Sequence, residues 1–256
     1  MGEWERIEEV LDSGELRRLL FFLALVPVNP YRVAKLLSEE TKGEFKKESI
    51  LVEYSRLSKR EECQKRFNLS DSLLTVIRKE EAEGRIRKTI QVNFDYVLDA
   101  LLTEKIRIED EALRKKIINA VKNFFKDKKL EPLVKNWKVF ASLLASLPFH
   151  IVLSAITLGI SLGSNEISKE EKKAIESSFL QYFNYYFMRN TKILAKSLQI
   201  LMLSNIIVSN QDLERLNIMR PFLEVAQGYI KELLEFIKKL LEFLQRYQTT
   251  RKYKNP

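Results

Sequence analysis

The amino-acid sequence predicts a mainly α-helical protein with one small β-hairpin in its first part. Three observations predict this fold class. The chain of 256 residues has only 7 Gly and 6 Pro, the residue types that most often interrupt helices. Apolar residues recur at helical spacing through most of the chain. Residues 85–94 (RIRKTIQVNF) instead alternate and are rich in β-branched side chains, as is typical of a strand.

Composition limits the chemistry that the chain can carry. Hydrophobic residues make up 45% and charged residues 31%, a balance typical of globular proteins. The single cysteine, Cys63, excludes an internal disulfide and an all-cysteine metal site, and a histidine-based site would need His150. The sequence has no glycine-rich phosphate loop, no GxSxG and no HExxH. We therefore expect no enzymatic activity, no cofactor and no metal; a metal-dependent nuclease built from scattered carboxylates is the alternative.

The first helical segments are delimited by prolines and a glycine. Residues 3–26 carry a broad leucine-rich face and are expected to form one or two helices that end before Pro27. Asn29 is a typical N-cap, Pro30 suits a first helical turn, and Gly43 ends the helix that follows. The acidic residues of the amino-terminal stretch do not resemble a secretion signal, so we expect a cytoplasmic protein.

Three further helices are expected before the strand. Ser58 and Glu61 have the spacing of a capping box, which predicts a helix start at Ser58. Gly84 is a typical helix end just before the strand. The expected helices are therefore residues 48–57, 59–67 and 71–83, with a polar break at 68–71.

The second part of the sequence reads as unbroken helix. A run of 27 residues, Val139 to Asn165, carries no charge and is long enough to span a bilayer. Because Pro148 divides this run, we favour a buried helical hairpin over a membrane span at residues 139–163. We interpret Cys63, His150 and the aromatic cluster at 179–187 as core residues.

The last helix, residues 212–248, repeats apolar residues at a/d spacing. Its wide stripe suits either a bundle within the chain or a second copy, and we expect a homodimer. The change from strand-containing to helical sequence near residues 104–110 predicts two domains, 1–105 and 106–256. The second is expected to be an all-helical bundle for dimerisation or partner binding. The expected interface residues are Leu223, Ile230, Leu233, Ile237, Leu240 and Leu244.

Residues 59–94 have the order of a helix-turn-helix with a wing. A short helix, a polar turn at 68–71 and a second helix at 71–83 would place that second helix in a DNA major groove. Cations of the following strand would then meet flanking phosphates. The expected DNA-binding residues are Ser70, Ser72, Thr75, Arg78 and Lys79 on or beside the helix, and Arg85, Arg87 and Lys88 on the wing.

These residues resemble the winged helix-turn-helix regulators, above all in the phrase KRFNLSDS…EEAEGRIRK. The resemblance covers about 80 residues and implies a winged-helix domain that binds DNA in transcription regulation. The sequence departs from the family at Glu80 and Glu81, where an apolar residue is usual, and at Arg85, where Leu is common.

A second alignment resembles the PadR-type subgroup of the same regulators. Here residues 16–43 supply the first two helices and residues 48–58 the reading helix. Residues 73–79 and 85–94 would form the wing hairpin. Both alignments place residues 85–94 in or beside the wing, and they disagree on the recognition helix. We favour residues 71–83 for that role.

The charge distribution leaves other functions open. Residues 1–107 carry 20 basic and 20 acidic residues, although Lys46 to Lys88 holds 12 basic and 8 acidic ones. Beside a DNA-binding transcriptional regulator, we therefore keep two alternatives that bind partners without catalysis. One is a helical scaffold or subunit of a larger nucleoprotein assembly, such as a viral or plasmid-encoded one. The other is a membrane-tethered winged-helix protein. A helical protein whose hairpin contacts no DNA is the simplest alternative.

Overall fold

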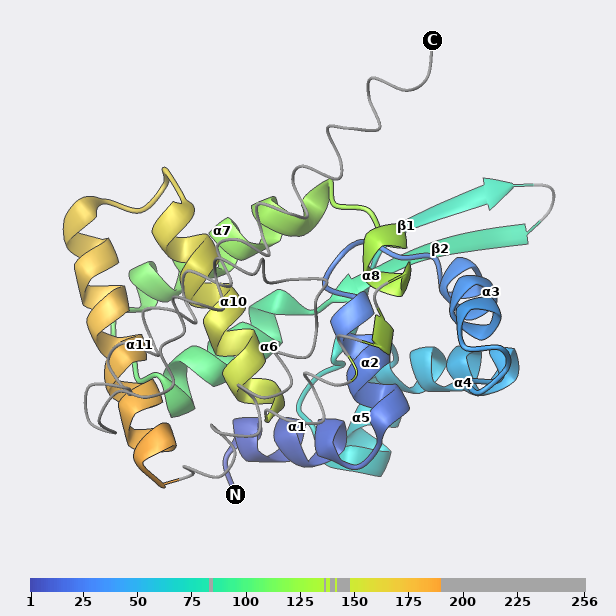
Figure 1. Ribbon diagram of the computed structural model, residues 1–256, viewed down its shortest axis with the longest axis horizontal. Coiled ribbons are helices and arrows are strands. Elements are labelled where there is room, and N and C mark those ends of the chain that lie inside the picture. Colours follow the sequence, from blue (N-terminus) through green and yellow to red (C-terminus); the bar gives the residue numbers. More distant parts are fainter. Residues whose placement is uncertain (83–84, 136, 139–140, 142–147, 190–256) are drawn as a thin grey trace, which may run out of the picture. The chain divides into compact units, whose positions relative to one another are not determined.

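The computed structural model describes residues 1–82, 85–135, 137–138, 141 and 148–189. It is mainly α-helical with a small antiparallel hairpin, which confirms the predicted fold class (Figure 1). The chain forms two compact units. The first comprises Met1–Lys105 and Val121–Ala141, and the second comprises Ile106–Ala120 and, among the later described residues, 148–189.

The first unit begins with α1 (Glu3–Asp12) and α2 (Glu15–Leu23). The apolar faces that the sequence predicted for this segment are buried, with Trp4 among the largest fully buried side chains. The start of α1 is capped from far along the chain. Glu104 accepts hydrogen bonds from the backbone N–H groups of Glu3 and Trp4, at 2.8 and 3.1 Å. A carboxylate at this position satisfies orphan donors of the first turn.

Helix α3 (Pro30–Glu40) begins as the sequence predicted. The Asn29 side chain accepts a hydrogen bond from the Arg32 backbone N–H at 3.1 Å, and Pro30 is the first helical residue. A tight turn follows, in which Gly43 has φ +84°. Glycine adopts this left-handed conformation without steric cost. The turn leads into α4 (Lys47–Leu57), which packs against α3.

Helix α5 (Arg60–Phe67) confirms the helix expected at 59–67. The predicted capping box is wrong, because Lys59 precedes the helix and the Ser58 hydroxyl donates to the carbonyl of Ser55 at 3.5 Å. The helix ends at Asn68, whose φ of +54° is left-handed, a conformation that Asn tolerates well.

The predicted helix at residues 71–83 is wrong. This segment forms strand β1 (Leu74–Ala82), which pairs antiparallel with β2 (Arg85–Val92). Three consecutive β-branched residues, Thr75 to Ile77, favour the strand. A bulge between Val76 and Arg78 interrupts the regular alternation. The expected strand at 85–94 is confirmed as β2, except that it ends at Val92.

The hairpin is anchored at its base by the segment between α2 and α3. Val28 and Ile90 exchange backbone hydrogen bonds of 2.9 and 2.8 Å, which extends the pairing by one bridge. Leu74, Ile90 and Val92 are buried, whereas Arg78 and Lys79 of β1 and Arg87 and Lys88 of β2 are exposed. In Figure 1 the hairpin projects away from the helices that surround its base.

The first unit is completed by later segments. Helix α6 (Phe94–Ala100) continues into the π-helical turn η1 (Leu101–Lys105). Helix α7 (Glu111–Lys126) contributes its last turns, where the ring of Phe125 stacks against that of Phe94 at 6.0 Å. Helix α8 (Glu131–Lys135) contacts α3.

The second unit contains α10 (Phe149–Gly163) and α11 (Lys169–Arg189). Phe149 and most of α10 are buried, and His150 Nδ1 lies 2.7 Å from the Tyr182 hydroxyl. Phe179 and Phe183 are fully buried, which confirms the core interpretation for these two rings. Within the described residues, no helix is both long and apolar enough to cross a membrane.

Two sequence predictions fall wholly or partly outside the described residues. Residues 139–140 and 142–147 of the uncharged run are not described, and Pro148 directly precedes α10. The helix expected at 212–248, with the interface predicted at Leu223, Ile230, Leu233, Ile237, Leu240 and Leu244, lies entirely outside them.

Candidate nucleic-acid interface

Helix α4 presents one face to the core and the other to solvent. Ile50, Tyr54 and Leu57 are buried at helical spacing, as the sequence predicted. The Tyr54 hydroxyl donates to the carbonyl of Leu20 at 3.3 Å, which ties α4 to α2. Burial raises the pKa of Tyr54 far above its ordinary value, so the hydroxyl remains a donor at every physiological pH.

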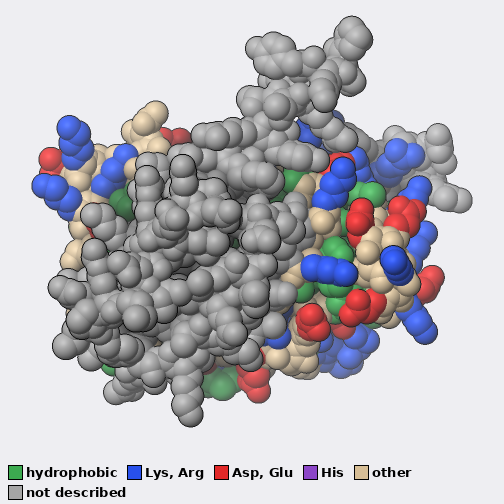
Figure 2. Space-filling model, viewed as in Figure 1, with side chains coloured by type: hydrophobic (Ala, Val, Ile, Leu, Met, Phe, Trp, Pro, Cys, Tyr) green, Lys and Arg blue, Asp and Glu red, His purple; other side chains and the backbone are tan. Residues whose placement is uncertain are grey.

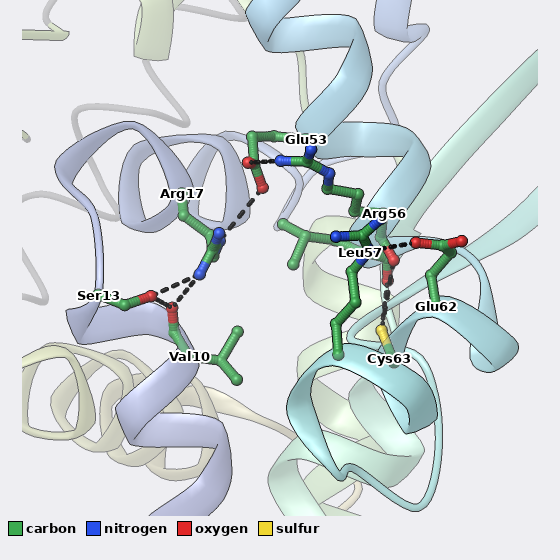
Figure 3. Close-up of polar contacts among 9 residues, drawn as sticks. Val10, Ser13, Arg17, Glu53, Arg56, Leu57, Glu62 and Cys63 are labelled. Carbon is green, nitrogen blue, oxygen red and sulfur yellow. Dashed lines mark hydrogen bonds and ion pairs between the residues drawn. The ribbon is translucent and has the colours of Figure 1, made fainter.

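A polar network fixes the rotation of α4 about its axis (Figure 3). The carboxylate of Glu53 contacts Arg17 Nε at 3.2 Å and Arg56 Nη1 at 2.8 Å. Arg17 also donates to the carbonyl of Val10 at 3.0 Å and to the Ser13 hydroxyl. The end of α1, the first turns of α2 and the middle of α4 are therefore joined through one guanidinium.

Cys63 lies beside this network as a buried core residue (Figure 3). Its thiol donates to the carbonyls of Arg56 and Leu57, at 3.4 and 3.6 Å. Burial raises the pKa of Cys63, which keeps the sulfur protonated and unreactive. The thiol therefore links α5 to the end of α4, as expected of a structural cysteine.

The opposite face of α4 is open to solvent. Lys47, Glu48 and Ser49 are exposed in the first turn, and Val52 is 46% exposed one turn later. A helix that follows a tight helix–turn and keeps its outer face uncovered has the form of a DNA-reading helix. Of the two segments considered as recognition helices, the one at 48–58 forms a helix, α4, whereas most of the other, at 71–83, forms strand β1.

The hairpin carries an unusual pair of cations. Lys79 of β1 and Lys88 of β2 are direct cross-strand partners, and both are exposed. Partners in an antiparallel pair share a face and have Cβ atoms about 5 Å apart, where like charges destabilise the sheet. Arg78 and Arg87 are also exposed on the hairpin. An anion lying between Lys79 and Lys88 would relieve their repulsion.

Ser70, Ser72 and Thr75, which were also predicted to bind DNA, are not gathered with these cations. Ser72 is 8% exposed and Thr75 is half-buried, both near the base of the hairpin, so the outward positions expected for them on a helix are wrong. Ser70 precedes β1, and its backbone N–H donates to Glu3 at 2.7 Å. Arg85 begins β2, and its side chain lies outside the described part of the structure.

The first turn of α3 connects the hairpin with α4. The Asn29 side chain donates to the carbonyl of Lys88 at 3.3 Å. The Lys47 ammonium lies 5.9 Å from the centre of the Tyr31 ring, which is 67% exposed. Lys88 and Lys47 therefore flank the start of α3, and sequence patterns had not singled out Asn29, Tyr31 or Lys47 as interface residues.

The surface around α3 and α4 is mixed in charge. Figure 2 shows Lys and Arg side chains interspersed with Asp and Glu over the described part of this face. Within that part of the chain, no three His, Cys, Asp or Glu residues are arranged to hold a metal ion. Such a surface can form charge pairs and hydrogen bonds with a polar partner.

Comparison with protein-family models, with curated proteins and with solved structures finds no match to this chain. The description of the interface therefore rests on the geometry of this structure alone.

Proposed function

We propose that the first unit binds double-stranded DNA and that the protein acts as a transcriptional regulator. In this proposal α4 enters the major groove, with Ser49 and Val52 toward the base edges. The hairpin lies along the flanking backbone, where Lys79 and Lys88 contact phosphate. The observation that carries the proposal is the cross-strand pairing of these two exposed lysines on a hairpin joined to the start of α3.

The arrangement supports DNA rather than a small anion for a geometric reason. The hairpin carries Lys79 and Lys88, the first turn of α4 carries Lys47, and the first turn of α3 separates these cations. A duplex offers phosphates at regular intervals along both strands, together with a groove wide enough for a helix. One ligand of this kind engages both features at once.

Binding to a labelled duplex of about 20 base pairs, two helical turns, tests the proposal. The full chain is titrated by fluorescence anisotropy over a series of salt concentrations. Replacing one phosphate-contacting lysine, as in Lys79→Ala or Lys88→Ala, should lower the slope of log K against log salt by about 0.9. It should also weaken binding to different duplex sequences by similar factors.

Lys173→Ala is the matched control, because Lys173 is an exposed lysine of α11 and its replacement changes the net charge equally. The proposal fails if the wild-type chain shows no salt-dependent binding. It also fails if both hairpin variants bind with the affinity and slope of the control.

We further propose that the regulator is a homodimer, since two reading heads match two half-sites on one duplex. The support is the apolar repeat at residues 212–248 of the sequence. Light scattering coupled to gel filtration measures the mass directly. A chain that stays at 30.2 kDa at the concentrations of the binding assay would contradict this part of the proposal.

A scaffold within a nucleoprotein assembly is the second candidate. The observation that favours it is the charge count, because residues 108–256 hold 24 basic and 15 acidic residues whereas residues 1–107 are balanced. In that case the same titration would give salt-dependent binding that both hairpin variants leave unchanged.

A further inference from the structure

We infer that Arg32 is an additional phosphate-contacting residue of this interface and that Glu131 competes with phosphate for it. The inference rests on the DNA-binding function proposed above and adds a residue outside the hairpin and α4. It follows from the position of Arg32, from its ion pair with Glu131 and from the way the segment that carries Glu131 is held.

Arg32 lies between the two parts of the interface. Its backbone N–H donates to the Asn29 side chain, which in turn donates to the carbonyl of Lys88. The neighbouring residue Tyr31 lies under the Lys47 ammonium of α4. The first turn of α3 therefore contacts both the hairpin and α4, and the Arg32 side chain on it is 64% exposed and open to an anionic ligand.

A carboxylate of the same chain already pairs with this guanidinium. Arg32 Nη2 donates to Glu131 Oε1, across 99 positions of sequence. Guanidinium binds carboxylate and phosphate with the same fork of N–H donors, so the two anions are interchangeable partners. The Arg32 side chain is 64% exposed, whereas that of Glu131 is 20% exposed. Solvent therefore screens the pair from the Arg32 side, and a DNA phosphate would compete with Glu131 for the exposed side of the guanidinium.

Glu131 is not a freely moving surface acid. It is the first residue of α8, which contacts α3, and the three following residues, Pro132 to Val134, are buried. A second contact holds the same segment farther along, where the Trp137 ring meets the Phe45 ring edge-on at 5.8 Å. Phe45 belongs to the turn between α3 and α4. The packing of α8 and of Trp137 therefore holds the Glu131 carboxylate beside Arg32.

The competition predicts opposite effects for the two partners. Arg32→Gln should weaken binding of the labelled duplex and lower the salt slope by about 0.9, the loss of one phosphate contact. Glu131→Gln removes the competing charge and should tighten binding at about 0.1 M salt by roughly two- to fivefold, the range that an exposed pair supplies. In the double variant, Glu131→Gln should give no gain, because Arg32 is absent.

Glu176→Gln is the matched control for net charge, since Glu176 is an exposed acid of α11. Circular dichroism melting of each variant excludes a loss of folding, and Arg32→Lys provides a variant that keeps the charge and should retain most of the slope. A Glu131→Gln affinity equal to that of Glu176→Gln, or an equal gain in the presence and absence of Arg32, overturns the inference. Those results leave the proposed function intact if Lys79→Ala and Lys88→Ala still lower the slope. If the wild-type chain does not bind the duplex, both the proposed function and this inference are refuted.

Discussion

Removing the carboxylate of Glu53 should destabilise the first unit by breaking the network that joins α4 to α1 and α2. In Glu53→Ala, Arg17 loses its 3.2 Å partner and Arg56 its 2.8 Å partner. The Arg17 and Glu53 side chains are only 17% and 14% exposed. Water therefore replaces the lost contact poorly, and the Arg17 guanidinium is left largely covered without its counter-charge.

The magnitude follows from these two contacts. A shielded hydrogen bond to a charged group contributes about 1.5–3 kcal/mol. The more exposed pair with Arg56, three residues along the same helix, adds about 0.2–0.5 kcal/mol. We therefore expect the free energy of unfolding to fall by about 2–3 kcal/mol, which lowers the melting temperature of a unit of this size by roughly 8–12 °C.

Urea and thermal unfolding followed by circular dichroism measure this loss. Glu48→Ala is the matched control, because Glu48 is an exposed acid on the same helix, and its replacement should change the unfolding free energy by less than about 0.5 kcal/mol. Equal stability of the two variants would refute the assignment of Glu53 as the residue that holds α4. A double-mutant cycle with Arg17→Ala then isolates the direct coupling between the two side chains.

Two further substitutions test the supports of the same unit. Tyr54→Phe removes the hydrogen bond to the Leu20 carbonyl, which also accepts from the Ala24 backbone N–H at 3.0 Å, and should cost about 0.5–1.5 kcal/mol in urea unfolding; a neutral effect would show that the Tyr54 hydroxyl adds nothing to the stability of the unit. Glu3→Gln tests pH dependence, because burial raises the pKa of Glu3 but hydrogen bonds from Ser70 and Tyr96 outweigh it and leave the pKa lowered. The ionised Glu3 carboxylate therefore stabilises the fold fully when the pH is above the ordinary glutamate pKa of about 4.3. This stabilisation is lost as the pH falls through the lowered pKa of Glu3. Melting temperatures of wild type and Glu3→Gln should differ at neutral pH and converge in acid, and a constant difference would contradict the assignment.

The helices of the first part could be predicted because their signals are local. Asn29 and Pro30 mark the start of α3, and Ile50, Tyr54 and Leu57 mark the buried face of α4. Each of these patterns lies within one element and depends on helical spacing alone. Local patterns of this kind remain valid in the folded chain whenever the element packs on one face only.

The favoured interpretation placed a helix where residues 74–82 form β1, because the bulge of this strand imitates a helix. The PadR-type alignment, which expected a hairpin of residues 73–79 and 85–94, agrees better with the structure. Leu73, Leu74 and Ile77 lie three and four positions apart, which is the spacing of a helical face. In the structure the first two are buried at the base of the hairpin, and Ile77 is an exposed bulge residue. The extra residue breaks the alternation that identifies strands. The run Thr75–Val76–Ile77 was the remaining signal for a strand.

Most of the candidate interface depends on contacts between distant segments, which no local pattern reveals. The ion pair between Arg32 and Glu131 spans 99 positions, and the pair between Arg17 and Glu53 spans 36. Likewise, the opposition of Lys79 and Lys88 exists only once the register of the hairpin is fixed. The sequence shows which charged residues are present, but which of them meet depends on the tertiary fold and on strand register.

The balanced charge of residues 1–107 does not argue against DNA binding by the first unit, which also includes Val121–Ala141 with six basic and two acidic residues. At physiological salt, electrostatic interactions decay over about 8 Å, so a phosphate responds to the groups next to it and not to the sum over the domain. Two ammonium groups held opposite each other on β1 and β2 form such a local concentration of positive charge. The basic excess of residues 108–256 acts on its own neighbourhood in the same way. Comparing the duplex affinity of Lys88→Ala with that of Lys173→Ala therefore tests whether the duplex lies near the hairpin or near α11. The net charge of the chain is the same in both variants and cannot distinguish the two.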